Sequence, residues 1–314
     1  MRRTGDCGTH RRRTHPLTEA AAMEPVVTVG LDGSPESLAA ARWAADEAAE
    51  RGLALRLLHA WPQLAPEPVR VPAEADQNYW ARRLVRTTRA ELQARHPDLP
   101  IVEALVADDA QNALLQAASD TGTEMVVLGS RGLEPVESYF LGDVSMPVVA
   151  RAGRPVVLVR ARSAERKPPP HAPTPRVIVA VKLSGPCDDV LDFAFHTAAA
   201  RGVPLLAVHG TRVPLPARVP WGVDHDVAEP MTREAQTGLD TVLRPWREKY
   251  PQVSVADSVR LTSPAEAVVR AAEGALLLVV GRRRHRRGLA PPLGPVTQAA
   301  IHHGRCPVAV VPHD

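Results

Sequence analysis

The chain of 314 residues contains two copies of one pattern of short apolar segments, and this repeat constrains its fold more than any other feature. The segment VVTVGLDGS at 26–34 matches RVIVAVKLS at 176–184, an offset of 150 residues. MVVLGSRG at 125–132 matches LLVVGRRR at 277–284, an offset of 152 residues. Length alone suggests about two domains. The repeat therefore predicts two domains of one fold.

Each copy alternates short Val- and Leu-rich segments with Ala-rich helical segments. The short apolar segments are typical of parallel strands that helices cover on both faces. Alternation of this kind with right-handed crossovers predicts a doubly wound, Rossmann-like α/β domain in each copy. In the first copy we expect helices after Ser34 and over 74–95 and 110–119, and five strands at 26–30, 55–59, 101–106, 125–129 and 156–159.

Composition sets the predicted boundaries. Residues 1–22 are Arg-rich without the apolar segment of a secretion signal, so we expect a disordered or non-native leader, with Met23 as a candidate start. The first domain is predicted at 23–160 and the second at 176–314. The Pro-rich segment 161–175 is predicted to be the linker between them.

The cysteine content and the apolar segments favour a cytoplasmic protein. Cys7, Cys187 and Cys306 provide neither a disulfide framework nor a paired metal-binding spacing, which favours a reducing compartment. Cys7 with His10 and His15 would be an incomplete metal site, so we expect no metal there. No segment approaches the ~20 apolar residues that span a bilayer, so we expect no membrane partner.

The net charge of +3 divides unequally along the chain. The leader has five Arg and two acidic residues, and everything from Met23 onward is neutral, with 33 basic and 33 acidic residues. Residues 23–159 have 12 basic and 19 acidic residues, whereas 176–314 have 17 and 13. We therefore predict attraction between an acidic and a basic half, and we do not expect a general nucleic-acid binder.

One basic run, RRRHRR at 282–287, is the exception that could suggest nucleic acid. No aromatic residue is interleaved to stack on bases. We predict that the run lies on a loop, either solvated or facing the acidic copy.

Ligands of doubly wound sheets bind beyond the carboxyl ends of the strands, near the reversal of strand order. Asp32 follows the first strand, and its carboxylate could accept hydrogen bonds from a ribose hydroxyl or a base edge. The fourth strand is followed by GSRGLEPVESYFLGDVS, in which nine residues separate Gly132 from Gly142 and Ser145 closes the run. Glycines permit close backbone approach, and a helix starting near Gly142 would direct free N–H groups at an anion.

These residues resemble the universal stress protein family, over essentially all of 24–314. The resemblance implies two five-stranded parallel sheets of the adenine nucleotide alpha hydrolase-like kind, paired face to face along their last strands, 155–159 and 307–311. It also implies an ATP-binding, cytosolic stress protein. The residues that it assigns to the nucleotide are Gly30, Asp32, Ala60, Leu128, Gly129, Ser130, Arg131, Gly132, Gly142, Asp143, Val144 and Ser145.

Two residues of the first copy depart from the family pattern. Asp143 stands where the family has a small hydroxyl residue, and at ~4 Å a carboxylate would repel phosphate by up to ~4 kcal/mol at an effective dielectric of about 20. A bridging Mg²⁺ or an outward rotamer would remove that cost. Pro147 falls in the first turns of the expected helix and could displace its start.

The second copy has the same pattern of apolar and helical segments but differs at the motif residues. Lys182 stands at the position of Asp32, Arg284 replaces the second glycine, and Pro295 follows Gly294. We expect a domain that binds no nucleotide, with a different anion as the alternative. His59 and His209 end equivalent strands, which favours packing over catalysis.

Three functions remain at this point. The first is a non-enzymatic stress-response regulator in which ATP shifts the arrangement of the two domains and the binding of an unidentified protein partner. The second is a ligand-free interaction scaffold with two vestigial pockets. The third is a slow ATPase, with Asp143 as its only candidate base. The sequence does not decide whether two chains associate.

Overall fold

The computed structural model describes residues 24–61, 77–130, 144–161, 175–213, 218–219, 222–223, 225–284 and 293–314. Strands and helices alternate in the first half of the chain, as the sequence predicts. Its elements are β1 (Val26–Gly30), α1 (Pro35–Arg51), β2 (Ala54–Ala60), α2 (Gln77–Arg95), β3 (Ile101–Val106), α3 (Ala110–Ser119), β4 (Thr123–Gly129), α4 (Ser145–Arg151) and β5 (Val156–Val159).

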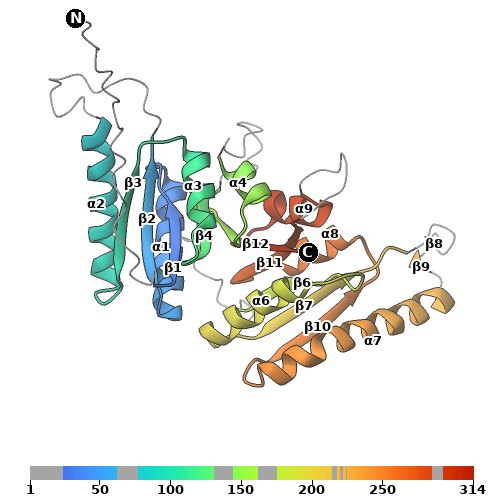
Figure 1. The fold of residues 1–314 in the computed structure, drawn as a ribbon. Helices are drawn as coiled ribbons and strands as arrows, with labels where there is room; N and C mark the ends of the chain where they lie inside the picture. The colour runs from blue at the N-terminus through green and yellow to red at the C-terminus, as the bar shows by residue number, and fades with distance from the viewer. Residues whose placement is uncertain are drawn as a thin grey trace, which may run out of the picture.

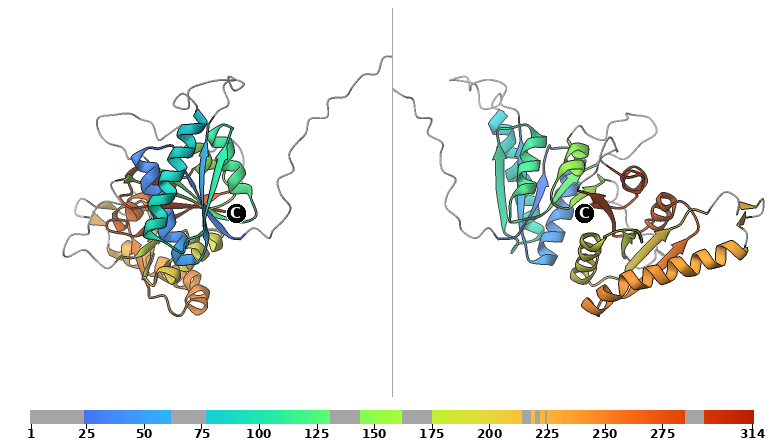
Figure 2. Two further views of the ribbon diagram at one scale, coloured as in Figure 1. Left: turned by 90° about the vertical axis from the view of Figure 1, so that its left-hand side faces the viewer. Right: turned by 45° about the vertical axis from the view of Figure 1, so that its right-hand side comes forward.

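The second half repeats this order, with a small hairpin and a longer helix inserted. Its elements are β6 (Val177–Ala180), α6 (Asp188–Arg201), β7 (Leu205–Gly210), β8 (Arg218–Val219), β9 (Gly222–Val223), α7 (His225–Lys249), β10 (Val255–Arg260), α8 (Pro264–Ala271), β11 (Leu277–Arg283), α9 (Pro295–His303) and β12 (Val308–His313). Helix α7 runs along the outside of this domain, next to the β8–β9 hairpin (Figure 2).

Ten strands form one continuous sheet in the order β10-β7-β6-β11-β12-β5-β4-β1-β2-β3. Within each half the strand pairs are parallel, and the two halves have equivalent strand orders. The sheet twists strongly between the halves, so the two domains appear in different orientations in Figure 1. The doubly wound, five-stranded parallel sheet predicted for each copy is therefore confirmed.

Local sequence signals set the ends of the first helix. Ser34 caps α1 by accepting a hydrogen bond from the Ser37 backbone N–H, and Pro35 occupies the first turn, where its missing N–H costs nothing. Gly52 ends the helix with φ of 65°, a left-handed conformation that glycine adopts without strain. These features match the sequence-based expectation.

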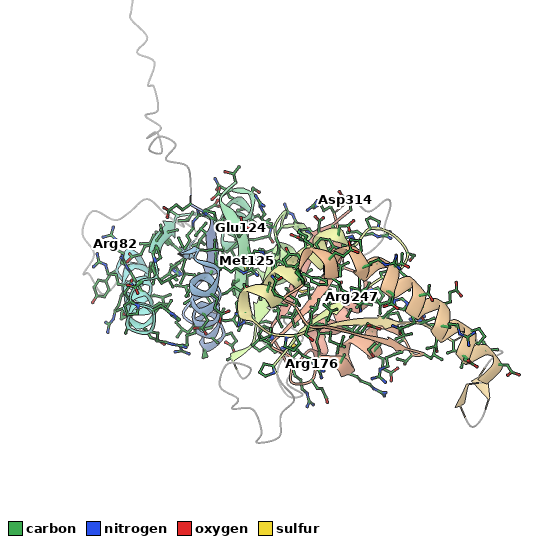
Figure 3. All side chains as sticks on the ribbon, turned by 90° about the horizontal axis from the view of Figure 1, so that it is seen from below. Arg82, Glu124, Met125, Arg176, Arg247 and Asp314 are labelled. Carbon is green, nitrogen blue, oxygen red and sulfur yellow. The ribbon has the colours of Figure 1, made fainter. Side chains whose placement is uncertain are left out.

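The hydrophobic core forms two layers, one on each face of the sheet. Helices α1, α2, α6 and α7 cover one face, and α3, α4, α8 and α9 cover the other. Each layer contains buried residues from both halves of the chain, so the core is continuous through the junction between the domains. Arg247 of α7, labelled in Figure 3, holds this long helix to the edge of the sheet by donating to Asp257 of β10 at 2.9 Å.

The two domains meet through their last strands. Strands β5 and β12 pair antiparallel, with Val157 opposite Ala309 at the centre of the ladder. This confirms the predicted pairing of 155–159 with 307–311. The pairing is edge to edge within one sheet, so the expected face-to-face arrangement is corrected. Each strand provides unpaired backbone groups at its edge, and the partner domain satisfies them.

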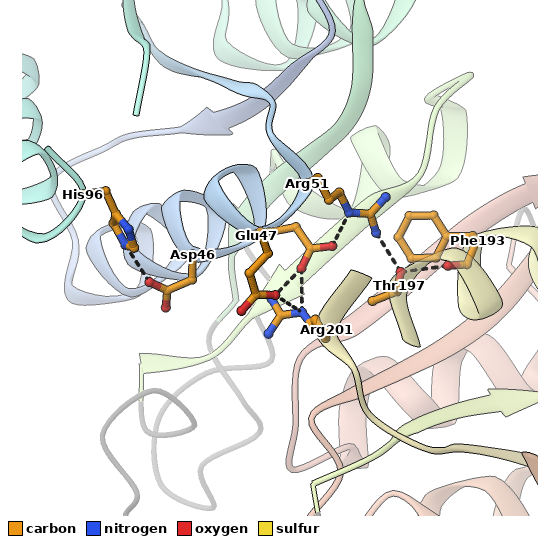
Figure 4. Close-up of polar contacts among 8 residues, drawn as sticks. Asp46, Glu47, Arg51, His96, Phe193, Thr197 and Arg201 are labelled. Carbon is orange, nitrogen blue, oxygen red and sulfur yellow. Dashed lines mark hydrogen bonds and ion pairs between the residues drawn. The ribbon is translucent and has the colours of Figure 1, made fainter. Parts of the chain in front are cut away.

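A buried ionic cluster joins α1 to α6 beside this ladder (Figure 4). The Glu47 side chain is 1% exposed and accepts from Arg51 Nε at 2.6 Å and from Arg201 Nε at 2.8 Å. Arg51 also donates to the Thr197 hydroxyl of the second domain at 2.7 Å, and Arg201 reaches Glu50 at 3.1 Å. A cation of the basic half thus pairs with carboxylates of the acidic half.

Two arginines extend the junction on the other face of the sheet. Arg160, just after β5, donates to the carbonyl oxygens of Ile301 at 2.7 Å and His302 at 2.9 Å, in the last turn of α9. Arg282 of β11 donates to the carbonyl of Ala152, at the end of α4. Each domain therefore places a cation on the negative end of the partner's last helix.

The position of Arg282 corrects one prediction. Arg282 and Arg283, the first two residues of the basic run, belong to β11 and do not lie on a loop. The Arg282 side chain is 6% exposed and is committed to the domain junction. The run continues through residues 285–287, which lie outside the described residues. Within the described ranges, no helix is long and apolar enough to cross a membrane.

Candidate functional site

The first candidate site lies at the carboxyl edge of the first domain. Strands β1 and β4 are parallel neighbours, and the strand order reverses between them, since β2 and β3 lie on one side and β5 on the other. The carboxyl ends of β1 and β4 therefore lie side by side. In doubly wound folds this reversal is where ligands bind.

Asp32 occupies the first turn after β1. Its side chain is exposed, and Oδ1 accepts the Ser34 backbone N–H at 2.8 Å and the Ser34 hydroxyl at 2.5 Å. Because Ser34 is also the N-cap of α1, the carboxylate and the helix start are held as one rigid turn. The turn presents an acceptor group at the edge of the sheet.

Two glycines of the predicted site have packing roles. A Cβ at Gly129 would lie 2.6 Å from the Glu36 backbone carbon and 2.7 Å from the Ser37 nitrogen. A Cβ at Gly30 would lie 2.9 Å from Leu128 Cδ2. Glycine at position 129 lets β4 approach the start of α1, and glycine at position 30 leaves room for the Leu128 side chain. The motif thus serves the fold whether or not a ligand is present.

The start of α4 is held against β4 by one hydrogen bond. Ser145 is the first residue of α4, and its hydroxyl donates to the Gly129 carbonyl at 3.3 Å. Val144 is the N-cap, with helical φ and ψ and no side-chain capping bond. Pro147 is the third residue of the helix, a position whose N–H has no intrahelical acceptor.

The remaining predicted residues divide into three groups. Leu128 is buried and Ala60 half-buried, at the ends of β4 and β2. The Ser130 side chain is buried, and its hydroxyl has no hydrogen-bond partner within the described parts of the chain. The last group, Arg131, Gly132, Gly142 and Asp143, lies outside the described residues.

The second domain has equivalent hydrogen bonds at the carboxyl edge of its strands. Thr297 of α9 donates to the Gly281 carbonyl at 2.9 Å, as Ser145 does to Gly129. His209 donates from Nδ1 to the Val181 carbonyl at 2.9 Å, as His59 does to Leu31 at 2.8 Å. The two histidines therefore join the ends of adjacent strands in both domains, in agreement with the packing role predicted for them.

The second domain also has a cavity of about 820 Å³ at its carboxyl edge, which sequence reasoning missed. The motif changes at Lys182 and Pro295 suggested a domain without a site, but both residues line this cavity. Its other lining residues are Ala180, Val181, Pro186, Cys187, Val190, Val208, His209, Gly210, Pro264, Val268, Gly281, Arg283, Gly294, Val296, Thr297 and His313. Among the residues that the structure describes, no cluster of His, Cys, Asp and Glu could hold a metal ion.

Together, the fold and this edge define a class: tandem doubly wound α/β domains that share one sheet and have candidate ligand sites at the reversal of strand order. The family model of the universal stress protein family matches residues 25–160 and 174–312. The chain belongs to the universal stress protein family.

Known relatives span both domains. The chain is 34% identical over 294 residues to Universal stress protein Rv2005c of Mycobacterium tuberculosis, covering 90% of this chain and 96% of the relative. It is 30% identical over 325 residues to Universal stress protein Rv1996 of the same organism, covering 92% and 96%. A universal stress protein structure from Archaeoglobus fulgidus, 16% identical, superposes with a TM-score of 0.59 over 92% of this chain and 98% of that chain.

Proposed function

We propose that this universal stress protein binds an adenine nucleotide in its first domain and acts as a non-enzymatic, cytoplasmic regulator. The observation that carries the proposal is the Asp32 turn at the reversal of strand order. The carboxylate is exposed and bonded there to Ser34, just past the end of β1, the strand that pairs with β4. The low cysteine content supports a reducing compartment.

The described residues fit a nucleotide in three respects. Asp32 offers an acceptor of the kind that recognises ribose hydroxyls in nucleotide-binding α/β folds. The buried hydroxyl of Ser130, unpartnered among the described residues, lies at the end of the adjacent strand. Ser145, bonded to Gly129, holds the start of α4 at the same edge. The nucleotide would supply phosphates, and the segment containing Asp143 would set whether Mg²⁺ accompanies them.

Regulation would work by population shift. The two domains share one sheet and a continuous core, so a ligand at the edge of the first domain can bias how the second is held only through the junction. A nucleotide with equal affinity for every arrangement would shift nothing. We therefore propose that the nucleotide favours one arrangement of the β5–β12 junction, which an unidentified protein partner then recognises.

The test is calorimetric titration of ATP and AMP into the full chain and three variants. Asp32→Ala should weaken binding at least tenfold. Lys182→Ala, the matched change in the second domain, should leave the affinity unchanged. Ser34→Ala removes the hydroxyl bond to the carboxylate but keeps the backbone N–H bond, so it should weaken binding by less than Asp32→Ala does. The absence of saturable heat, or equal affinities for wild type and Asp32→Ala, would refute the proposal.

One observation favours a second function, that of a ligand-free interaction scaffold. The Oδ1 atom of Asp32 already accepts two hydrogen bonds from Ser34, and Gly30 and Gly129 are explained by packing. On this hypothesis the motif remains because the fold needs it. Native mass spectrometry of gently purified protein distinguishes the two functions, since nucleotide at about one per chain is incompatible with a ligand-free scaffold.

A further inference from the structure

The cavity of the second domain differs chemically from a nucleotide site. Its volume of about 820 Å³ falls within the ~300–1,000 Å³ of small-molecule sites. Much of its wall consists of valine side chains, from Val190 of α6, Val208 of β7, Val268 of α8 and Val296 of α9. Such a wall favours an apolar ligand body, because the burial of apolar surface is the main gain available there.

The charged side chains that line this cavity, among the described residues, are all basic. Lys182 and Arg283 line it from the ends of β6 and β11, and both side chains are exposed. Neither forms a hydrogen bond or an ion pair with any residue that the structure describes. A Cβ built on Gly185 would lie 3.9 Å from Arg283 Nη2. The guanidinium therefore reaches the loop that carries Lys182, which places two cations at one side of the cavity.

Among the residues that the structure describes, no carboxylate lines the cavity to neutralise these cations. Three acidic residues adjoin the lining in sequence: Asp188 follows Cys187, and Asp189 and Asp314 form ion pairs with Arg284 at 3.5 and 3.8 Å. Neither these acids nor Arg284 is among the described lining residues. A cavity with basic groups at its mouth and no acid in its lining raises the local concentration of anions. The ligand head should therefore be negatively charged.

A nucleotide fits these walls poorly. Lys182 offers only donors where Asp32 of the first domain offers acceptors, so ribose hydroxyls would lose the acceptor they need. Thr297 already donates its hydroxyl to the Gly281 carbonyl, and Pro295 has no N–H for a phosphate.

We propose that the second domain binds a small organic anion, an acidic head joined to an apolar body. The head contacts Lys182 and Arg283, and the apolar body lies against the valine wall. This site is independent of the nucleotide proposed for the first domain. It would let the chain respond to an amphipathic metabolite through the same junction.

The experiment uses the full chain and the fluorescent apolar anion anilinonaphthalene sulfonate as the probe. We expect saturable binding of one probe per chain. Octanoate should displace the probe at least tenfold better than octanol, which has the same apolar body and no charge. Because charge-assisted hydrogen bonds are the strong ones, Lys182→Gln and Arg283→Gln should each weaken probe binding roughly tenfold. Val296→Trp, which fills the half-buried edge of the cavity without a change in charge, should abolish binding.

Arg284→Gln is the matched control. It makes the same charge change one residue from Arg283, on a side chain that is paired with acids and lies outside the cavity. It should leave probe affinity unchanged, and thermal unfolding should show that all four variants are folded. The proposal is overturned if no saturable site exists, if Arg284→Gln weakens binding as much as Arg283→Gln, or if ATP displaces the probe better than octanoate in an Asp32→Ala background.

Discussion

Replacement of Glu47 by glutamine is the sharpest test of how the two domains are held together. The Glu47 carboxylate is 1% exposed and bonds to two guanidinium groups, whose side chains are 7% (Arg51) and 9% (Arg201) exposed. Glu47→Gln preserves the shape of the side chain but removes the buried negative charge that bonds to both arginines. The guanidinium groups of Arg51 and Arg201 would then remain buried with less negative charge nearby to offset theirs.

The expected loss of folding free energy follows from the contacts that the two arginines keep in the variant. Removal of one partner of a buried ion pair typically costs 3–5 kcal/mol of folding free energy. Arg51 would keep the Thr197 hydroxyl at 2.7 Å, and Arg201 would keep Glu50 at 3.1 Å. We therefore expect a loss near the lower end, about 3 kcal/mol. Urea unfolding followed by circular dichroism and tryptophan fluorescence measures it as a lower midpoint.

Glu50→Gln is the control, because it neutralises a second carboxylate on the same arginine. The Glu50 side chain is 40% exposed, and burial together with Glu47 and Asp46 raises its pKa despite Arg201. Its charged form is thus disfavoured in the folded chain, and Glu50→Gln should cost less than ~1 kcal/mol. If Glu47→Gln costs no more than Glu50→Gln, the cluster does not hold the junction together and the reasoning fails.

Three further outcomes follow from the packing and the titrating groups. Gly129→Ala should destabilise the fold by about 1–3 kcal/mol in the same unfolding assay, since its Cβ would overlap the start of α1. Gly153→Ala, whose Cβ would meet nothing within 4 Å, should change the stability little. Equal effects of the two variants would contradict the packing role of Gly129. Burial raises the pKa of Cys306 to about 12, so iodoacetamide at pH 8 should leave it unmodified in the native chain and label it in urea, as peptide mass mapping would show. Burial lowers the pKa of His196 and His302 in the folded chain, so their stabilising contribution is present above about pH 6.5 and is lost as pH falls below it. Replacing both by Gln should therefore reduce the fall in the free energy of unfolding between pH 7 and 5. An unchanged dependence of that free energy on pH would refute this.

The sequence predicted the fold because its signals are local and repeated. The Ser34 cap, the Gly52 stop and the buried Val-rich strands specify each element from its own residues, and two copies at a fixed offset specify two domains. It did not predict that Arg282 is buried, because a run of arginines resembles a solvated loop. The acceptor at Ala152 lies 130 residues away in the chain, and only the pairing of β5 with β12 brings it within reach.

In the candidate sites, too, some features follow from the local sequence and others only from the tertiary structure. The sequence by itself determined which residues end the strands of the first domain, including Asp32, since strand ends follow from local pattern. The tertiary structure alone decided that Glu47 meets Arg201 rather than solvent, and that the second domain retains a cavity after its motif changed. The physical reason is that a motif consists of single residues, whereas a cavity depends on the packing of helices and strands around it. The second domain has the same packing of strands and helices as the first, although it has Lys182 at the position of Asp32.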